Sequence, residues 1–476
     1  MRLLMLAALA LGSTSASAQM PPGGKPLPPR WETTAREIYK TAVEIPTVAG
    51  RGQVPKLADY LAGKFRDAGW DESDIHVLPY GSTGGEQTAA LIARWPAAGR
   101  PKAKPILILG HLDVVEALAS DWGTDPFKLV EKDGYFYGRG SGDDKLGVIS
   151  TVVALMKLRS SGFKPDRDIV VLYTGDEEIG GRGAELGATE WRKWTDAEYA
   201  LNADGGGCDF DADLRPLGCP VQTAEKIFQS YTLTVRNPGG HSSRPRPDNA
   251  IYELADALKK LQARRFKPAL NETTRAYFEA RAKQEGDTPL GDAMRAWLAN
   301  PDDQAAADAI EANPLEVGLT RTRCVATMLR GGHADNALPQ MAEATVNCRI
   351  MPGTAPKQVQ ADLQQLVGPK VEIATLAFEG RPSPASPLRA DVLGAFTRSV
   401  RARFPTQIVL PFMSTGASDG VYFRERGIPV YGVNAGWGIS PTDNRAHGKD
   451  ERVPVQSLWD NIQHWERMLR ELAASR

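Results

Sequence analysis

The residues from Pro105 to Asp113 read Pro-Ile-Leu-Ile-Leu-Gly-His-Leu-Asp, a short apolar run that ends in an imidazole and a carboxylate. Two further apolar runs follow along the chain, Ile169–Thr174 and Tyr199–Ala203. The first of these is followed by Gly-Asp-Glu-Glu and the second by Asp-Gly-Gly-Gly. Short runs bounded by glycine and polar residues are typical of strands that are buried on both faces. A helix-like stretch between the first two runs, Leu146–Leu158, makes parallel strands the best interpretation.

The alternation of helices and strands predicts an α/β protein with a doubly wound, mostly parallel sheet. Near Phe228 the pattern changes to an alternating strand, an amphipathic helix, a charged helical stretch and a hairpin around residues 322–351. These elements predict a smaller α+β domain that is inserted into the larger one. We place the inserted domain at residues 228–376 and the larger, discontinuous domain at residues 31–227 and 377–476.

Acidic and imidazole side chains follow the predicted strands at the point where each strand ends. Because the carboxyl ends of parallel strands meet at one edge of a sheet, we expect these side chains to gather there. Another acidic loop, from Gly138 to Lys145, precedes the helix-like stretch. So many carboxylates would repel one another unless cations neutralised them, and two divalent ions supply four positive charges. The mixed donor types favour a two-metal site over acids that lie apart on solvated loops. The residues concerned are His111, Asp113, Asp143, Glu177, Glu178 and Asp204.

Further motifs bear on the interpretation of this site. His447 lies in a polar loop after the last predicted strand, where it could be a ligand of a second metal ion. The glycines from Gly138 to Gly142 have the wrong spacing for a dinucleotide-binding fingerprint. Ser414 would be a nucleophile only with a histidine beside it. The segment that contains Ser414 and Gly416 is better interpreted as a tight loop that offers hydroxyl and backbone N–H groups to a substrate.

The overall composition excludes some classes of protein. Lys and Arg number 57 and Asp and Glu number 58, so the net charge of −1 argues against a nucleic-acid binder held by electrostatic attraction. Hydrophobic residues make up 42% and charged residues 24%, an ordinary globular mixture that excludes wholesale disorder. Beyond the N-terminus no run reaches about 18 consecutive apolar residues, so we expect no membrane span.

The N-terminus has the pattern of a targeting segment. Arg2, the apolar run Leu3–Leu11 and the small residues before Gln19 predict a signal peptide over residues 1–18, the alternative being a frayed apolar end. Residues 19–30 are rich in proline and glycine, and we expect an extended, mobile leader there. The protein is therefore expected to be exported, either periplasmic or secreted, into an oxidising compartment.

The four cysteines allow three pairings. Cys208 and Cys219 enclose a short polar loop, which favours a disulfide between them. Cys324 and Cys348 lie in two β-like runs on either side of a turn, where they would face each other across a hairpin. A pair of buried free thiols is an equal alternative for this second pair. Neither pair has the spacing of a structural zinc site.

Together these motifs resemble those of the dizinc metallopeptidases and amidohydrolases. This family includes glutamate carboxypeptidase, carnosine dipeptidase, aminoacylase, acetylornithine deacetylase and succinyl-diaminopimelate desuccinylase. The resemblance covers nearly the whole chain after the leader, with the motifs in family order. The motifs that carry it are His111-Leu-Asp113, Gly138–Lys145, Asp176-Glu177-Glu178, Asn202-Ala-Asp204, Gly240-His241-Ser242, Asn336-Ala-Leu-Pro339, Cys348-Arg349-Ile-Met-Pro-Gly353 and Ala446-His447.

The resemblance implies a role for each matching residue at the metal site. Two zinc ions would be bound, one by His111 and Asp204 and the other by Glu178 and His447. Asp143 would bridge them, since its spacing to Lys145 matches the family pattern better than that of its neighbour Asp144. Glu177 would be the general base, and Asp113 would orient His111 through its free ring nitrogen.

The resemblance also implies that the inserted domain is a lid and dimerisation domain. His241 would reach the site of a neighbouring subunit in a homodimer and donate a hydrogen bond to the developing oxyanion. Arg349 would pair a free carboxylate of the substrate, and Asn336 would line the substrate site. The stretch between residues 265 and 320 is longer than in compact family members, which leaves the lid shape and the substrate size open.

The function predicted from these observations is an exported, zinc-dependent hydrolase that cleaves amide bonds of small peptides, like a dipeptidase or carboxypeptidase. An N-acyl-amino-acid deacylase of the same family is the alternative. A non-catalytic exported protein that binds peptides or metal is the alternative of another class, and the presence of Glu177 argues against it. Related dizinc aminopeptidases without an inserted domain are disfavoured by the segments around His241 and Asn336.

Overall fold

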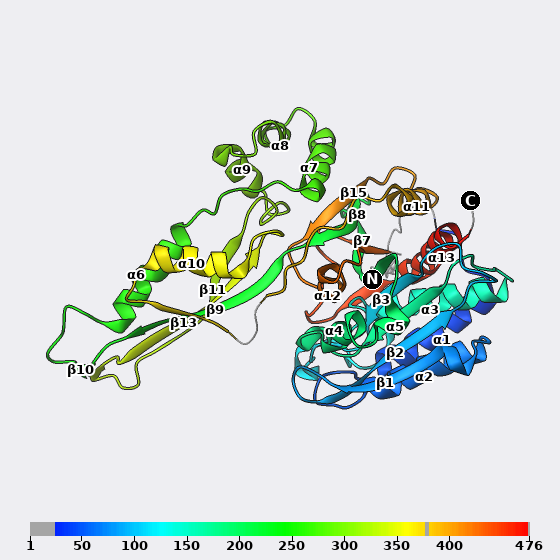
Figure 1. The fold of residues 1–476 in the computed structure, drawn as a ribbon, viewed down its shortest axis with the longest axis horizontal. Coiled ribbons are helices and arrows are strands. Elements are labelled where there is room, and N and C mark those ends of the chain that lie inside the picture. The colour runs from blue at the N-terminus through cyan, green and yellow to red at the C-terminus, as the bar shows by residue number, and fades with distance from the viewer. Residues whose placement is uncertain (1–23, 377–379, 475–476) are drawn as a thin grey trace, which may run out of the picture.

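The structure is a computed structural model, and it describes residues 24–376 and 380–474 (Figure 1). The predicted signal peptide and residues 19–23 of the leader lie outside the described residues. Among the helices of the described part, none is long and apolar enough to cross a membrane.

The larger sheet has eight strands in the order β1-β2-β6-β3-β7-β16-β8-β15. Its centre, β6-β3-β7-β16, is parallel, while β2 and β8 run antiparallel to their neighbours in that centre. The three apolar runs of the sequence form β3, β6 and β7, three adjacent strands, as predicted. The strands are Ile75–Gly81 (β1), Gln87–Trp95 (β2), Ile106–His111 (β3), Ile169–Thr174 (β6), Tyr199–Phe210 (β7), Pro216–Glu225 (β8), Val409–Ser414 (β15) and Val430–Ile439 (β16).

Helices cover both faces of this sheet, which explains why its central strands are apolar throughout. In β3, Ile106 and Ile108 belong to the core on one face, and Leu107 and Leu109 belong to the core on the other. The prediction of a doubly wound, mostly parallel sheet is confirmed. The helices on the first face are Pro29–Glu44 (α1), Val54–Asp67 (α2), Lys145–Ser160 (α3), Ala390–Arg401 (α11) and Val455–Leu472 (α13), and those on the second are Arg182–Ala188 (α4), Arg192–Thr195 (α5) and Gly420–Glu425 (α12).

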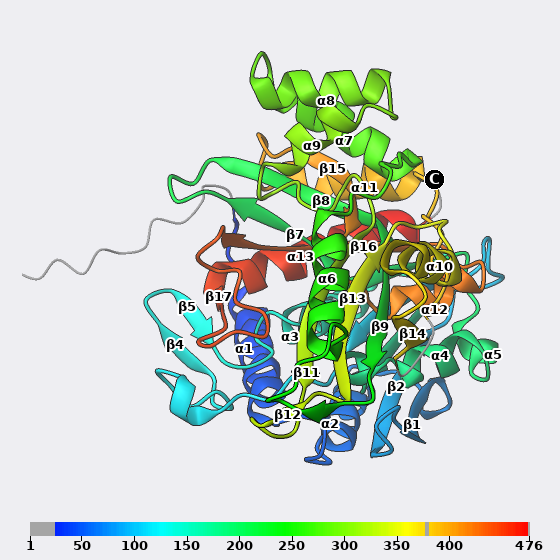
Figure 2. The same cartoon turned by 90° about the vertical axis from the view of Figure 1, so that its left-hand side faces the viewer.

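A second sheet has four antiparallel strands in the order β11-β13-β9-β14, with two helices packed on one face. It extends away from the larger sheet, and the short pair β10–β12 lies at its far end (Figures 1 and 2). This is the α+β unit that the sequence predicts. Its elements are Ile227–Arg236 (β9), Gly240–His241 (β10), Arg323–Gly331 (β11), Ala337–Leu338 (β12), Met341–Ile350 (β13), Glu372–Thr375 (β14), Ala250–Ala263 (α6) and Pro356–Val367 (α10).

The charged stretch before the hairpin forms three helices whose described side chains are not part of the hydrophobic core of the second sheet. They share a core with β8 and β15 of the larger sheet, where Phe278 and Trp297 lie with Met413. Part of the inserted stretch thus packs on the larger sheet. The domain limits at residues 228 and 376 therefore stay a prediction. The helices are Glu272–Glu285 (α7), Pro289–Ala299 (α8) and Gln304–Glu311 (α9).

Two local expectations differ from the structure. Residues 24–28 of the leader lie in no helix or strand, and Pro29 and Arg30 already belong to α1. The leader is held in place, since Leu27 is buried and Gln463 of α13 donates a hydrogen bond to the Lys25 carbonyl at 2.7 Å. Strand β7 continues past Ala203 to Phe210, because β16 pairs with it through register shifts at Gly206. A Cβ atom at Gly206 would lie 2.6 Å from the Asn434 carbonyl oxygen, so only glycine fits there.

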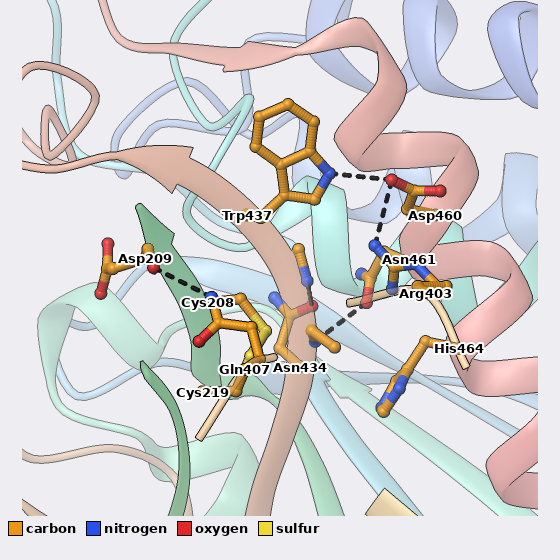
Figure 3. Close-up of a disulfide and its surroundings, with 12 residues drawn as sticks. Cys208, Asp209, Cys219, Arg403, Gln407, Asn434, Trp437, Asp460, Asn461 and His464 are labelled. Carbon is orange, nitrogen blue, oxygen red and sulfur yellow. Dashed lines mark hydrogen bonds and ion pairs between the residues drawn. A yellow bond between two sulfur atoms is a disulfide. The ribbon is translucent and has the colours of Figure 1, made fainter. Parts of the chain in front are cut away.

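Both predicted disulfides are present in the structure. Cys208 and Cys219 join β7 to β8, and Figure 3 shows the bond beside Gln407 and Asn434. Cys324 and Cys348 are direct cross-strand partners in β11 and β13. The alternative of buried free thiols is therefore wrong for the second pair.

Candidate metal centre

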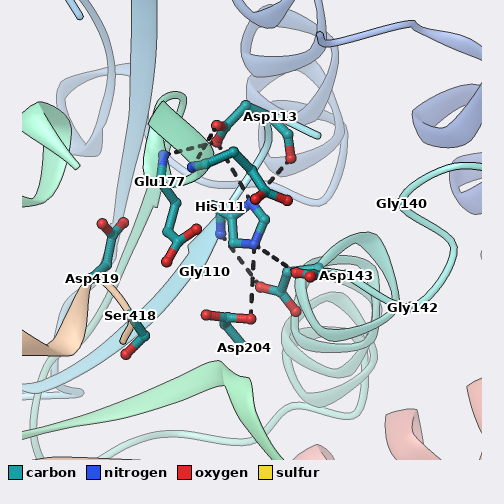
Figure 4. Close-up of polar contacts among 12 residues, drawn as sticks. Gly110, His111, Asp113, Gly140, Gly142, Asp143, Glu177, Asp204, Ser418 and Asp419 are labelled. Carbon is teal, nitrogen blue, oxygen red and sulfur yellow. Dashed lines mark hydrogen bonds and ion pairs between the residues drawn. The ribbon is translucent and has the colours of Figure 1, made fainter. Parts of the chain in front are cut away.

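The carboxyl ends of the central strands bring the predicted residues together. His111 is the last residue of β3, Glu177 and Glu178 follow β6 after a two-residue turn, and Asp204 lies in β7 (Figure 4). These strands are adjacent and parallel, so the three segments emerge at one edge of the sheet. The loop that carries Asp143 and the loop that carries His447 close over the same edge.

Asp143 lies between the two histidines of the cluster. Its Oδ1 atom is 3.0 Å from Nε2 of His111, and its Oδ2 atom is 3.1 Å from Nε2 of His447. Glu178 completes the second side, with Oε2 at 3.0 Å from the same His447 nitrogen. Asp204 lies on the first side, with Oδ1 at 3.8 Å from His111 Nε2. One carboxylate thus presents an oxygen to each of two neighbouring groups of donors.

The adjacent Asp144 has a different environment from Asp143. It is buried, and its Oδ2 atom accepts a hydrogen bond from the His111 backbone N–H at 3.3 Å. Glycines leave room for it, since a Cβ atom at Gly110 would lie 2.9 Å from Asp144 Oδ2. Asp144 thus supports the end of β3, whereas Asp143 faces both histidines.

Asp113 fixes more than the orientation of His111. The His111 Nδ1 atom lies 3.0 Å from the Asp113 backbone oxygen and 3.5 Å from its carboxylate. The carboxylate accepts hydrogen bonds from the backbone N–H groups of Glu177, at 3.1 Å, and Glu178, at 3.0 Å. With Nδ1 engaged, His111 presents Nε2 to the cluster, and the same aspartate holds the turn that carries the two glutamates.

The electrostatics of the cluster reflect an excess of carboxylates. Burial lowers the pKa of His111, but hydrogen bonds to three carboxylates outweigh it and raise that pKa well above its ordinary value. Hydrogen bonds to Asp143 and Glu178 raise the pKa of His447 to about 10. Burial raises the pKa of Asp204 to about 6, and it raises that of Glu177 well above its usual range. The carboxylate charge that raises the pKa values of the two histidines is the charge that a divalent cation would neutralise.

The donor set fits divalent metal ions. The ligand atoms of His111, Asp143 and Glu178 all lie within 4.8 Å of one another, as do those of His111, Asp144 and Asp204. Imidazole nitrogen and carboxylate oxygen together suit zinc and similar borderline ions. Each histidine faces at least two carboxylates, so the residues present match the requirements of two neighbouring ions.

Two acidic residues near the cluster, Asp176 and Asp419, were given no role by the sequence analysis. Asp176 accepts hydrogen bonds from the Tyr80 hydroxyl at 2.6 Å and from two backbone N–H groups at the start of α4, which anchors the Glu177 turn. Asp419 accepts a hydrogen bond from Thr174, the last residue of β6. In Figure 4 the Glu177 side chain points toward the space between Asp204 and Asp419. A single buried acid after a strand carries no local signal that distinguishes such roles.

The loop around Ser414 forms a tight turn. The Ser414 hydroxyl accepts a hydrogen bond from the Gly416 backbone N–H at 3.0 Å, within its own loop. Residues 416–420 have the Gly-x-Ser-x-Gly spacing of a nucleophile motif. The Ser418 hydroxyl, however, donates to the buried Glu225 at 2.9 Å, and no described histidine contacts it. The nucleophile interpretation therefore has no geometric support.

Arg349 lies on the face of the second sheet that its helices leave open. Its guanidinium carbon is 4.7 Å from the ring centre of Phe228, its cross-strand neighbour. Burial lowers the pKa of Arg349, and no acidic partner contacts it among the described residues. Directly opposite on β11, Arg323 is paired with Glu311 of α9. Arg349 is thus a half-buried cation whose charge is free to bind an anion.

His241 and Asn336 lie at the far end of the second sheet, away from the cluster (Figure 1). Both are exposed, and the Ser242 backbone N–H donates to the Asn336 carbonyl at 3.1 Å. The Ser243 backbone N–H donates to His241 Nδ1 at 3.1 Å, so the proton of the neutral ring lies on Nε2. His241 therefore presents an N–H donor outward, but not to the cluster of its own chain.

Comparisons with known proteins agree with this geometry. Residues 107–471 match the sequence profile of Peptidase family M20/M25/M40. The human N-fatty-acyl-amino acid synthase/hydrolase PM20D1 is 30% identical over 373 residues, which cover 75% of this chain and 72% of that protein. The M20 family metallo-carboxypeptidase Sso-CP2 from Sulfolobus solfataricus has a similar structure, with a TM-score of 0.69, 20% identity and coverage of 92% of this chain and 98% of that one. The YXEP protein of Bacillus subtilis, a dinuclear metal binding peptidase from the M20 family, has a TM-score of 0.57, 13% identity and coverage of 93% and 99%.

The fold and the site thus define a hydrolase of the metallopeptidase and amidohydrolase class. The chain belongs to Peptidase family M20/M25/M40, as the order of its motifs predicts.

Proposed function

We propose that this protein is an exported two-metal hydrolase that cleaves an amide bond whose nitrogen belongs to an amino acid with a free carboxylate. The observation that carries the proposal is the position of Asp143, with one carboxylate oxygen toward His111 and the other toward His447. Two zinc ions would be held here, one by His111 and Asp204 and the other by Glu178 and His447, and Asp143 would supply an oxygen to each.

Two divalent ions bound there would lower the pKa of a shared water and polarise the scissile carbonyl. Glu177 would take the proton from that water. The Asp113 carboxylate that fixes its turn and the direction of its side chain into the site support this role. It would then pass the proton to the leaving nitrogen. Arg349 would hold the free carboxylate of the substrate, and the N–H of His241 from a second subunit would stabilise the oxyanion.

The acyl side of the substrate separates two candidate activities. Our first proposal is a dipeptidase or carboxypeptidase, in which the acyl group is an aminoacyl or peptidyl group. The second is an N-acyl-amino-acid hydrolase, which the similarity to the human N-fatty-acyl-amino acid synthase/hydrolase favours. In both activities the protein would cleave an amide bond next to a free substrate carboxylate, with the same two-metal chemistry.

The experiment that tests the proposed function is a hydrolysis screen of zinc-loaded protein. The panel contains dipeptides and N-acyl amino acids that share one C-terminal residue, together with their C-terminal amides. We expect hydrolysis of at least one free acid and little hydrolysis of its amide. Zinc binding without hydrolysis of any member would favour the alternative of a non-catalytic peptide- or metal-binding protein.

Replacement of Arg349 tests the carboxylate contact. Arg349→Ala should reduce kcat/KM for free-acid substrates by about 30-fold, roughly 2 kcal/mol, because the carboxylate loses a partly desolvated partner. Amide analogues should change little. Arg330→Ala is the matched control, since Arg330 lies on β11 of the same sheet and is paired with Glu343. Equal losses on acids and amides would instead indicate a structural arginine.

We further propose that the protein is a homodimer joined through the second sheet. Strand β11 is an edge strand of that sheet, and it exposes Val325, Met328 and Leu329. Helix α6 exposes Ile251 and Tyr252. An edge strand with exposed apolar side chains favours pairing with another chain. A two-fold dimer also gives His241 a site to reach, since it lies away from the cluster of its own chain.

Mixed dimers test whether His241 acts in the partner's site. Homodimers of Glu177→Ala and of His241→Ala should each be nearly inactive. In a mixed dimer one site carries both defects and the other carries neither. Random re-association of equal amounts makes about half of the dimers mixed, so roughly a quarter of wild-type activity should return. If mixed dimers form and no activity returns, His241 does not act across the interface.

We also propose export, by way of a signal peptide over residues 1–18, to the periplasm or the medium. The two disulfides support this proposal, because such bonds persist in oxidising compartments. Intact-mass measurement of the exported protein should give a chain that begins at Gln19. A chain that retains Met1 and remains in the cytoplasm would contradict it.

A further inference from the structure

We infer that Glu451 is a positioning residue that sets the distance between the bridging carboxylate and the second histidine of the proposed metal centre. Among the described contacts, its carboxylate has no hydrogen bond or ion pair with the Asp143 carboxylate or the His447 imidazole. It acts by binding the backbone of the loop that carries Asp143, while its own loop carries His447. This inference rests on the proposed function, and it adds a residue to which no role has been given.

The Glu451 carboxylate is buried and is surrounded by donors from a single loop. Its Oε1 atom accepts from the backbone N–H groups of Gly142, at 2.7 Å, and Asp143, at 3.2 Å. Its Oε2 atom accepts from the Gly140 N–H at 3.0 Å and from the Arg139 guanidinium at 2.7 Å. Three backbone donors and one cation thus converge on one side chain.

This arrangement explains the glycine-rich segment that matched no nucleotide-binding pattern. Successive backbone N–H groups that point inward form a concave anion site, and here the anion is a side chain of the same protein. Gly140 has a φ of 77°, in the left-handed region that glycine adopts without strain. A Cβ atom at Gly142 would lie 3.3 Å from Glu451 Oε1, so a side chain there would crowd the carboxylate.

The loop of His447 is held by the same contacts from the other side. Arg139 donates a second hydrogen bond to the Gly448 carbonyl at 3.0 Å, and the Gly138 N–H donates to the Glu451 carbonyl at 3.0 Å. His447 and Asp450 have φ values of 62° and 51°, which non-glycine residues rarely adopt. Such a loop keeps its shape only where its surroundings impose it. The hydrogen bonds of Arg139 and Glu451 therefore hold both the loop of Asp143 and the loop of His447.

Glu451→Gln is the test, because the side chain keeps its size but gains an NH₂ donor. The NH₂ group would replace either Oε1 or Oε2, and each of these oxygens accepts two hydrogen bonds from N–H donors. The variant therefore loses at least two of the four hydrogen bonds. Glu316→Gln is the matched control. Glu316 is also buried and paired with an arginine, Arg281, but it contacts neither loop. Arg139→Lys is a milder second variant, which keeps the charge and loses the fork geometry.

Two measurements are made on each protein. The first is zinc affinity in a titration against a chelating competitor. Glu451→Gln should weaken the second ion by about 10- to 100-fold, with Arg139→Lys showing a smaller loss and Glu316→Gln none. The second is amide hydrogen exchange in metal-free protein. Peptides that cover residues 138–145 and 445–451 should exchange faster in Glu451→Gln and at wild-type rates in Glu316→Gln.

Each outcome decides the inference. Unchanged zinc affinity and unchanged exchange in Glu451→Gln and Arg139→Lys would overturn it. Equal zinc loss in Glu316→Gln would also overturn it, because the effect would then be one of global stability. If Glu451→Gln does not fold, a selective loss of the second ion in Arg139→Lys supports the inference. A wild-type protein that binds no zinc would overturn the proposed function. The hydrogen-exchange data would still show whether Glu451 holds the loops at residues 138–145 and 445–451 in place.

Discussion

Chelation of the metal should abolish amide hydrolysis completely, and added zinc should restore it. The purified protein should hold about two equivalents of zinc or a similar ion, because five donors converge in two groups that share Asp143. In the proposed mechanism the ions polarise the scissile carbonyl and activate the attacking water, so their removal would take away both effects. Elemental analysis and activity before and after dialysis against a chelator provide the measurement.

Single histidine variants serve as controls for this result. His111→Ala should bind fewer ions, because its imidazole faces two candidate ligands. His333→Ala should keep the wild-type metal content, since His333 is exposed in the hairpin turn between β11 and β12. Full hydrolytic activity in metal-free protein would contradict the site assignment.

Glu177→Gln should lower turnover by about 10²- to 10⁴-fold while the metal content stays near two. The substitution removes the proposed base with little change in volume. The Asp113 carboxylate would still hold the turn through the same backbone N–H group. Metal analysis and steady-state kinetics on the same sample measure the two effects separately.

The variant Glu178→Gln is the comparison that separates the role of a base from that of a metal ligand. Glu178 faces His447 at 3.0 Å, so this variant should lose metal as well as activity. If Glu177→Gln loses metal and Glu178→Gln retains it, the two adjacent roles are reversed.

The local sequence determines the strands of the site and the donor types at their ends. Runs such as Ile106–Gly110 are apolar on both faces because both faces are covered, and this pattern is visible without a structure. The helix-like stretch between the first two runs also predicts that the strands are parallel, whereas the order β6-β3-β7, with the first run in the middle, is decided by the tertiary structure. His111, Glu177 and Asp204 are predictable as neighbours, since strand ends meet at one edge.

Long-range loop contacts are not visible in a local pattern. In the sequence, Asp143 is preferred to Asp144 only by its spacing to Lys145 in the family pattern. The fold gives the physical reason, because it turns Asp143 toward both histidines and Asp144 toward the backbone of β3. Nothing in the spacing shows that α7–α9 pack on β15 or that Leu27 is buried. These positions depend on which surfaces remain uncovered once the sheets have formed.

What the sequence by itself determined is the fold class, the family and the set of candidate donors, because periodicity and strand-end chemistry are properties of neighbouring residues. What only the tertiary structure decided is how the donors are held. Glu451 binds the Asp143 loop across 308 residues of chain, and His241 lies at the end of a separate sheet. Such contacts form only when distant loops close on each other, and the free energy of that closure depends on the whole fold rather than on any local run of residues.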